Sequence, residues 1–420
     1  MKTKILVRAP VLSRSGYGEQ SRFALRSLRS REDRFDIYLL NVSWGQTGWS
    51  WEDNEERKWI DTLIEKTVNY DGPYDVSLQV TIPNEWQKLA PINIGYTAGI
   101  ETDRVAPEWL MKGNEMDKII VTSTFAKQGF QETGYTMSDR EGNEVPGKLV
   151  CDTPIEVVGY PVKYYDPDPV ELDLTTQFNF LAVAQWSIRK NVEQLITGFV
   201  EEFKKENVGL ILKLNTRNNS ILDRNLTKQK IQDLLSNYPD KKCQVYLLHG
   251  DLTDEQMTYL YQYKKIKSLI TLAHGEGFGL PIFEAVYNEL PVISPAWSGQ
   301  VDFLYAPNDK GAMKPMFADV DYDIQQVQPE AAWDLGKYGK VLIAESNWCY
   351  PKKSSYMKTL RHVYSKYKVY KDKAKRLKKW IELDFEQEKQ YEKFCKVFDV
   401  YCQQDNSWMN EIEDIVQQYE

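Results

Sequence analysis

The chain has 420 residues, of which 42% are hydrophobic and 27% are charged, and its formal net charge is -8. A single hydrophobic core stops growing at roughly 250–300 residues, so the length predicts two domains, and the composition is that of a folded protein rather than a disordered one. The negative net charge argues against a protein that coats nucleic acid non-specifically, because such binding needs a basic face.

The sequence gives no sign of export or of membrane insertion. The first residues lack a secretory signal, and no stretch approaches the roughly 20 apolar residues of a membrane-spanning helix. The five cysteines are odd in number and scattered, with neither disulfide-framework nor metal-ligand spacing. We therefore expect a cytoplasmic protein without a metal site.

Strands and helices alternate in the first part of the chain. A buried strand is expected over residues 4–9, followed by the loop SRSGYG and a helix over residues 19–28. Further apolar runs predict strands at residues 37–40, 76–80, 92–96 and 119–121. Such alternation predicts a parallel, doubly wound α/β sheet.

A second series of strands is expected at residues 178–183, 208–214, 244–248, 268–272 and 291–294. The proline-containing stretch 160–177 predicts an interdomain link, and the sequence after residue 350 is helical and highly charged. We therefore expect an N-terminal domain over 1–165, a C-terminal domain over 166–350, and helices over 351–420 that pack back toward the first domain. The basic run at 366–379 predicts a solvated helix face, with a polyanion-binding patch as the alternative.

A glycine-rich loop over residues 273–280 stands between a predicted strand and a helix that opens at Pro281. Gly275, Gly277 and Gly279 allow a backbone to approach a ligand closely, and the helix dipole directs positive potential at the loop. This pattern predicts an anion site that suits a diphosphate.

Charged residues lie on both sides of this loop. Glu276 lies within it and Glu284 follows in the helix, and carboxylates accept hydrogen bonds from sugar or ribose hydroxyls. Arg189 and Lys190 follow the strand at 178–183, and ligands of open α/β sheets bind at the carboxyl ends of strands. We therefore expect these cations near Glu276, where they can compensate a diphosphate.

Four segments resemble a known enzyme family. The donor domain of family 4 retaining glycosyltransferases is similar to FLAVAQWSIRKN, HGDLTDEQMTYLYQ and HGEGFGLPIFEAVYNELPVIS, and VTSTFAKQGF resembles the strand and loop that end their first domain. The resemblance covers residues 178–297 well and the N-terminal part loosely. It implies the GT-B fold, in which two Rossmann-like domains face each other across a cleft. It also implies a nucleoside-diphosphate sugar donor, with a UDP-sugar as first expectation, retention of anomeric configuration, and no required metal or cofactor.

The resemblance also implies roles for single residues. Glu276 is expected to contact the transferred sugar, Glu284 the ribose, and Lys190 with Arg189 the diphosphate. The remaining expected donor contacts are Gly277, Phe278, Gly279 and Leu280 in the loop, Gln185 where most members have an arginine, and Gly16 and Gly18 in the first domain.

The acceptor site has weaker signals. Many relatives place a histidine in the first domain, but this chain has none there and offers Glu101 and Asp103 instead. We hypothesise that one of these acids orients the acceptor, with helix capping as the alternative. Trp49 and Trp51, in a polar loop that also contains Trp44, are expected to contact the acceptor, with burial against the first domain as the alternative.

The sequence therefore predicts a hexosyl- or pentosyltransferase acting on a hydroxyl of a glycan or small molecule. The aromatic-rich chain also suits a phage enzyme in a host cytoplasm, so an alternative acceptor is a hydroxymethylated base in DNA. A second alternative is a non-catalytic protein that binds sugar nucleotides.

Overall fold

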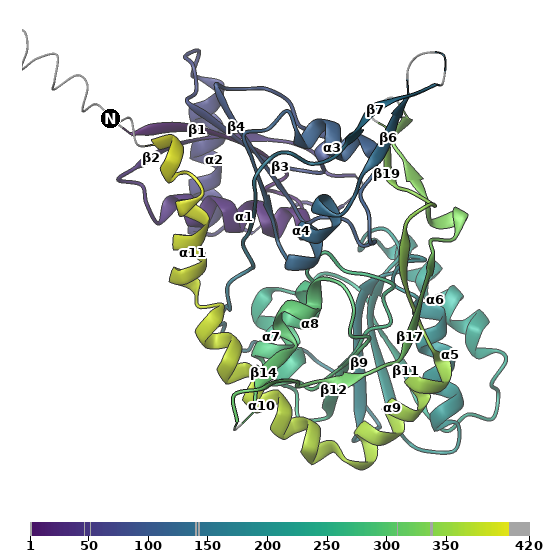
Figure 1. Ribbon diagram of the computed structural model, residues 1–420. Coiled ribbons are helices and arrows are strands. Elements are labelled where there is room, and N and C mark those ends of the chain that lie inside the picture. Colours follow the sequence, from purple (N-terminus) through teal and green to yellow (C-terminus); the bar gives the residue numbers. More distant parts are fainter. Residues whose placement is uncertain are drawn as a thin grey trace, which may run out of the picture.

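The computed structural model describes residues 2–45, 47–50, 52–138, 141, 143–308, 310–336 and 339–402. Two parallel six-stranded sheets, one in each half of the chain, form its framework (Figure 1). In spatial order, the strands of the N-terminal sheet are β2 (Phe35–Asn41), β1 (Thr3–Ala9), β3 (Val76–Val80), β4 (Ile92–Thr97), β5 (Lys118–Val121) and β8 (Ile155–Val157). The predicted parallel α/β sheet is confirmed for this half.

Helices connect the strands of this sheet. They are α1 (Gly16–Arg29), α2 (Glu55–Val68), the 3-10 turn η1 (Pro83–Glu85), α3 (Pro107–Gly113) and α4 (Thr124–Gln131). Helix α1 begins where the Ser15 hydroxyl accepts a hydrogen bond from the Gly18 amide at 3.1 Å, and it buries Phe23 and Leu28 against the sheet. The hairpin of β6 (Tyr135–Ser138) and β7 (Glu144–Leu149) projects from this half (Figure 1).

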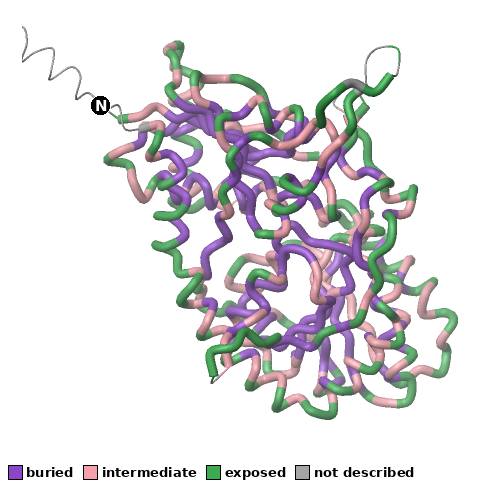
Figure 2. The backbone as a smooth tube through the Cα atoms, in the orientation of Figure 1, coloured by how far each residue is buried: buried purple, intermediate pink, exposed green. Residues whose placement is uncertain are grey.

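The C-terminal sheet is built in the same way. In spatial order, its strands are β11 (Gln244–Leu248), β10 (Gly209–Asn215), β9 (Asn179–Gln185), β12 (Ile266–Ile270), β13 (Val292–Ser294) and β16 (Ala318–Asp319). Its helices are α5 (Val192–Phe203), α6 (Ile221–Leu235), α7 (Asp254–Gln262), α8 (Leu280–Tyr287) and the 3-10 turn η2 (Gly299–Phe303). Buried backbone gathers along both sheets (Figure 2). The second predicted sheet is therefore confirmed as well.

An irregular arm that the sequence did not predict follows the C-terminal sheet. It contains the strand pairs β14 (Tyr305–Pro307) with β15 (Met313–Pro315), β17 (Tyr322–Gln326) with β20 (Asn347–Pro351), and β18 (Trp333–Asp334) with β19 (Lys340–Leu342), and the turn η3 (Pro329–Ala331). Val341 and Ile343 of this arm are buried in a cluster with Trp109 and Phe130 of the N-terminal half. The arm therefore crosses from one sheet to the other.

As far as residue 402, the charged C-terminal segment forms the expected helices, and residues 403–420 lie outside the described residues. They are α9 (Lys353–Ser365), α10 (Tyr367–Asp384), α11 (Gln387–Lys396) and α12 (Asp399–Cys402). Helix α9 packs on α5, α10 on α8, and α11 on α1 of the N-terminal half (Figure 1). The rings of Phe394 and Phe23 lie 5.5 Å apart, and the Cys395 thiol donates to the carbonyl of Ser27. The domain limits at residues 165 and 350 stay predictions.

Candidate functional site

The glycine-rich loop joins β12 to α8 at the carboxyl edge of the C-terminal sheet. Helix α8 begins at Leu280, one residue before the predicted Pro281, and Gly279 caps it with φ of 96°. Side chains other than glycine rarely adopt this left-handed conformation, so the cap needs glycine. The amino end of α8 therefore faces the same edge as the loop, as an anion site requires.

Glu276 is the centre of an ion cluster in this loop. The Lys190 ammonium donates to its Oε1, and the Arg189 guanidinium contacts its Oε2 at 3.1 Å. Arg189 also donates to the Gly275 carbonyl at 2.8 Å and lies 3.4 Å from a carboxylate oxygen of Glu101. Only 8% of Glu276 is exposed. The structure thus brings together Glu276, Lys190 and Arg189, which the sequence analysis expects at the transferred sugar and the diphosphate.

The two cations of this cluster differ in their electrostatics. Burial opposes ionisation of Glu276, but the charges of Lys190 and Arg189 outweigh it and hold the glutamate pKa below its ordinary value. Burial lowers the pKa of Lys190, and Glu276 offsets only part of that effect. Burial likewise opposes the charge of Arg189, yet Glu101 and Glu276 raise its pKa above the ordinary value. Arg189 is therefore a fixed charge, whereas the charge of Lys190 depends on its partner.

Glu284 lies in the second turn of α8 and has a different environment. The Tyr261 hydroxyl donates to its Oε2 at 2.8 Å. Burial raises the pKa of Glu284 to about 7, although the Tyr261 hydrogen bond works against the rise, and Asp254 adds to it. This carboxyl group therefore titrates near neutral pH when no ligand is present.

A cavity of about 1030 Å³ lies between the two halves of the chain and contains all of these groups. Eleven of the predicted site residues line it: Glu276, Lys190, Arg189, Glu284, Gly277, Phe278, Gly279, Leu280, Gln185, Gly16 and Glu101. The side chain of Phe278 is buried against Tyr160 and Phe303, so a ligand contact there falls to its backbone. The walls come from both halves of the chain: helices and loops of the N-terminal half, and strand ends, loops and helices of the C-terminal half.

Gly275 and Gly277 have a role that the sequence analysis did not foresee. A Cβ added at Gly275 lies 2.0 Å from the Glu101 carbonyl oxygen, and one at Gly277 lies 2.4 Å from that of Ala98. The Ser123 hydroxyl also donates to the Gly277 carbonyl at 2.6 Å. These two glycines therefore allow the loop to pack against the N-terminal half, in addition to any approach of a ligand.

Two predicted residues of the N-terminal half lie outside the cavity lining. The Asp103 carboxylate accepts hydrogen bonds from the amide and the side chain of Asn347, both at 2.7 Å, so it joins the N-terminal half to the arm. A Cβ at Gly18 would meet the Ser13 carbonyl oxygen at 1.8 Å, so this glycine serves the tight turn before α1. Asp103 and Gly18 therefore make contacts within the protein and do not line the cavity.

The tryptophan loop also differs from the expectation. Trp49 is 54% exposed, pairs through its backbone with Ser13, and is not part of the cavity lining. Trp51 lies outside the described residues. Trp44, which was named only as a neighbour, lines the cavity. Among the described tryptophans of this loop, Trp44 lines the cavity and Trp49 does not.

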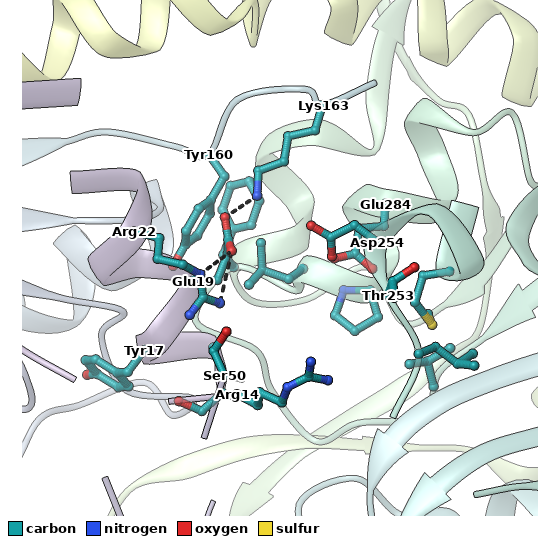
Figure 3. A pocket seen from close by; sticks show the side chains of 18 of the residues that line it. Arg14, Tyr17, Glu19, Arg22, Ser50, Tyr160, Lys163, Thr253, Asp254 and Glu284 are labelled. Carbon is teal, nitrogen blue, oxygen red and sulfur yellow. Dashed lines mark hydrogen bonds and ion pairs between the residues drawn. The ribbon is translucent and has the colours of Figure 1, made fainter. Parts of the chain in front are cut away.

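The sequence analysis missed a second ion cluster in the cavity. The Glu19 carboxylate of α1 pairs with Lys163 of the segment between β8 and β9, with Arg22 at 3.2 Å and with Arg26 at 3.1 Å. Although Glu19 is buried, these cations hold its pKa far below the ordinary value. Figure 3 shows this cluster across the pocket from Glu284 and Asp254. The only signal in the sequence was a lysine within the apolar and aromatic run YPVKYY.

Within the described residues, no group of three histidine, cysteine, aspartate or glutamate side chains is placed to hold a metal ion. Over the same ranges no helix is long and apolar enough to cross a membrane.

No protein-family model and no curated protein matches the sequence. Solved structures do match over nearly the whole chain. Sucrose-phosphate synthase from Thermosynechococcus elongatus matches with a TM-score of 0.60 at 11% identity, covering 94% of this chain and 98% of the other. HepE from Anabaena in complex with UDP-glucose matches with a TM-score of 0.59 at 12% identity, covering 94% and 99%. The lipopolysaccharide outer core galactosyltransferase WaaB matches with a TM-score of 0.52 at 13% identity, covering 94% and 99%.

The chain thus has the GT-B glycosyltransferase fold, as its sequence resemblance implied. More particularly, it is similar in structure, at 12–13% sequence identity, to the galactosyltransferase WaaB and to HepE, which was solved with UDP-glucose. The matches lend no support to a phage origin.

Proposed function

We propose that the protein transfers a sugar from a UDP-sugar to an acceptor hydroxyl with retention of anomeric configuration. The observation that carries the proposal is the cluster of Glu276, Lys190 and Arg189 on the wall of the cavity between the two sheets. An ionised carboxylate and two cations at the amino end of a helix can bind the two unlike parts of a nucleotide-sugar, its hydroxyls and its diphosphate.

The donor is proposed to exchange partners with this cluster. Its diphosphate lies against the amides of residues 277–280 and takes Lys190 and Arg189 from Glu276. The freed carboxylate then accepts hydrogen bonds from hydroxyls of the sugar, and Glu284 accepts those of the ribose. The charges of Glu276, Lys190 and Arg189 are therefore held in place before the donor arrives.

The transfer step follows from this placement. The acceptor oxygen forms a bond to the anomeric carbon on the face from which UDP leaves. The carbon–oxygen bond to the β-phosphate breaks, its electron pair stays on the phosphate oxygen, and that oxygen takes the acceptor proton. Lys190 and Arg189 stabilise the charge that develops there, a type of contribution worth about 10²–10³ in rate for a single donor group. No side-chain base is required.

The structural matches guide the choice of donor for a first test. Because HepE was solved with UDP-glucose, this compound is the first probe. We expect calorimetry to detect binding of UDP, and chromatography to detect slow release of UDP from UDP-glucose in water or faster release with an acceptor. A wild-type protein that binds neither compound, and is equally inert toward other UDP-sugars, would refute the proposal.

A matched pair of variants locates the activity. Lys190→Ala is expected to reduce UDP release by about 10² or more. The control is Lys353→Ala, which removes an exposed lysine that pairs with Glu201 at 2.7 Å outside the cavity lining. Equal activity of both variants would show that the cluster does not bind the diphosphate.

The two alternatives receive less support. The basic run falls in α10, none of whose residues lines the cavity, so it gives no reason to prefer DNA as acceptor. Acidic side chains in the lining are about as numerous as basic ones, which is unfavourable for a polyanion. A non-catalytic protein would bind UDP-glucose without releasing UDP, and the same assay detects that outcome.

A further inference from the structure

Two aromatic rings line the cavity on the side of the N-terminal half. The ring centroids of Tyr17, in the first turn of α1, and Trp44, in the loop after β2, lie 4.3 Å apart with an angle of 35° between the ring planes. Both residues are partly buried. The donor contacts proposed above use neither of them.

The pair stands next to the reacting end of the donor site. The Tyr17 hydroxyl pairs with the Thr97 hydroxyl at 2.7 Å, and burial together with the nearby Glu101 carboxylate keeps the Tyr17 pKa above its ordinary value. Glu101 in turn contacts Arg189, which contacts Glu276. An acceptor lying against the rings would therefore have its hydroxyls beside Glu101 and close to the transferred sugar.

The loop that holds Trp44 is fixed to the turn before α1. The Thr47 hydroxyl bonds to the Ser13 hydroxyl at 2.6 Å and donates to the Trp44 carbonyl at 2.8 Å. The Arg14 amide donates to the Gly48 carbonyl at 2.8 Å, and the Ser50 amide to that of Leu12 at 2.7 Å. Because these contacts are made within the chain itself, they hold the two rings in position for an acceptor.

The surroundings of the wall are polar and carry both signs of charge. Ser50, Glu52 and Asn54 line the cavity on the same loop, and Arg14 pairs with Glu52 and, at 3.2 Å, with Asp251. Figure 3 shows Tyr17, Ser50 and Arg14 at one edge of the pocket. A neutral ring with an apolar face and peripheral hydroxyls fits this arrangement, since carboxylates and hydroxyls surround the two aromatic rings.

We infer that Trp44 and Tyr17 form the acceptor subsite, and that its occupant is an uncharged pyranose ring that stacks on the aromatic wall. The inference rests on the proposed function, because it needs a donor in the same cavity. It gives Trp44 a role in acceptor affinity alone and leaves donor binding to the C-terminal half.

The test measures sugar binding to the UDP-loaded protein by saturation-transfer NMR. The probes are the methyl glycosides of glucose, galactose, mannose and N-acetylglucosamine. At least one is expected to bind, and Trp44→Ala is expected to weaken it about tenfold or more, while Trp44→Phe keeps most of the affinity. The control is Trp49→Ala, which removes the exposed tryptophan of the same loop outside the cavity lining.

The outcomes separate the two proposals. If UDP binds but no glycoside does, or if Trp44→Ala binds the glycosides as the wild type does, the acceptor subsite is wrong and the donor site stands. If UDP itself does not bind, the proposed function fails as well. Preferred transfer to duplex DNA containing a hydroxymethylated base, unaffected by Trp44→Ala, would also overturn the pyranose subsite.

Discussion

The affinity for UDP-glucose is expected to rise with pH because of Glu284. Burial raises the pKa of this carboxyl group to about 7 in the ligand-free protein. Ribose hydroxyls that donate to the ionised carboxylate favour the charged form, so donor binding should release a proton. Binding and proton release are thus coupled at a single side chain.

The magnitude follows from the titration of one group. With a pKa of about 7, about one tenth of Glu284 is ionised one pH unit below and about nine tenths one unit above. If only the ionised form binds well, the affinity for UDP-glucose increases about tenfold across that span, or about 1.4 kcal/mol. UDP-glucose is a better probe than UDP, because its diphosphate has no proton to lose near neutral pH.

Isothermal titration calorimetry between about pH 6 and pH 8, in buffers of different ionisation enthalpy, measures both the affinity and the released proton. His274, the histidine of the glycine-rich loop, is not expected to interfere, since burial lowers its pKa. The control is Glu284→Gln, which should bind weakly at every pH and release no proton. An affinity that is independent of pH in the wild type, or one that falls as pH rises, would refute the contact between Glu284 and the ribose.

Further predictions concern stability and the joining of the two halves. Because the pKa of Glu284 is raised in the folded protein, its protonated form stabilises the fold fully below about pH 4.5, and this stabilisation is lost as pH rises through about 7. Above that pH, Glu284→Gln should therefore have a free energy of unfolding up to about 3 kcal/mol higher than the wild type, measured by urea unfolding. Lys190→Ala should lower the free energy of unfolding by about 3 kcal/mol, because it removes a partner from a buried carboxylate. Adding Glu276→Gln to this variant should restore part of that free energy, and a further additive loss would contradict the prediction. Gly275→Ala should keep the halves apart, which small-angle scattering would detect as a larger radius of gyration; an unchanged radius would contradict the packing role. Asp103→Ala should lower the unfolding free energy by about 1–2 kcal/mol and leave the acceptor KM unchanged, whereas a large rise in KM would return Asp103 to the acceptor site.

The sequence predicted those parts of the molecule that local patterns determine. Apolar runs such as Val76–Val80 and Gln244–Leu248 match observed strands residue for residue. The rule that ligand sites lie at the carboxyl edge of parallel strands was enough to bring Lys190 and Arg189 to Glu276, although 86 residues separate Lys190 from Glu276.

The missed parts depend on contacts between distant segments. Strand β17 is largely exposed and pairs with β20 across the arm, so it lacks the buried run that marks a strand in the sequence. Trp44 and Trp49 lie in the same short loop, and their sequence surroundings are similar. The attachment of this loop to the turn before α1 decides which ring reaches the cavity. For Lys163, the partner Glu19 lies 144 residues away, and no local pattern connects them.

In the proposed mechanism, Glu276 has two successive tasks, first as the partner of the two cations and then as a hydrogen-bond acceptor for the sugar. Burial lowers the pKa of Lys190, and the Glu276 carboxylate beside it opposes that lowering. Glu101 from the opposite half, together with Glu276, raises the pKa of Arg189. When the diphosphate replaces the carboxylate as the partner of both cations, their charge is retained and Glu276 becomes available to the sugar. We therefore propose that this ion cluster is the donor site itself rather than a structural ion pair that would block it.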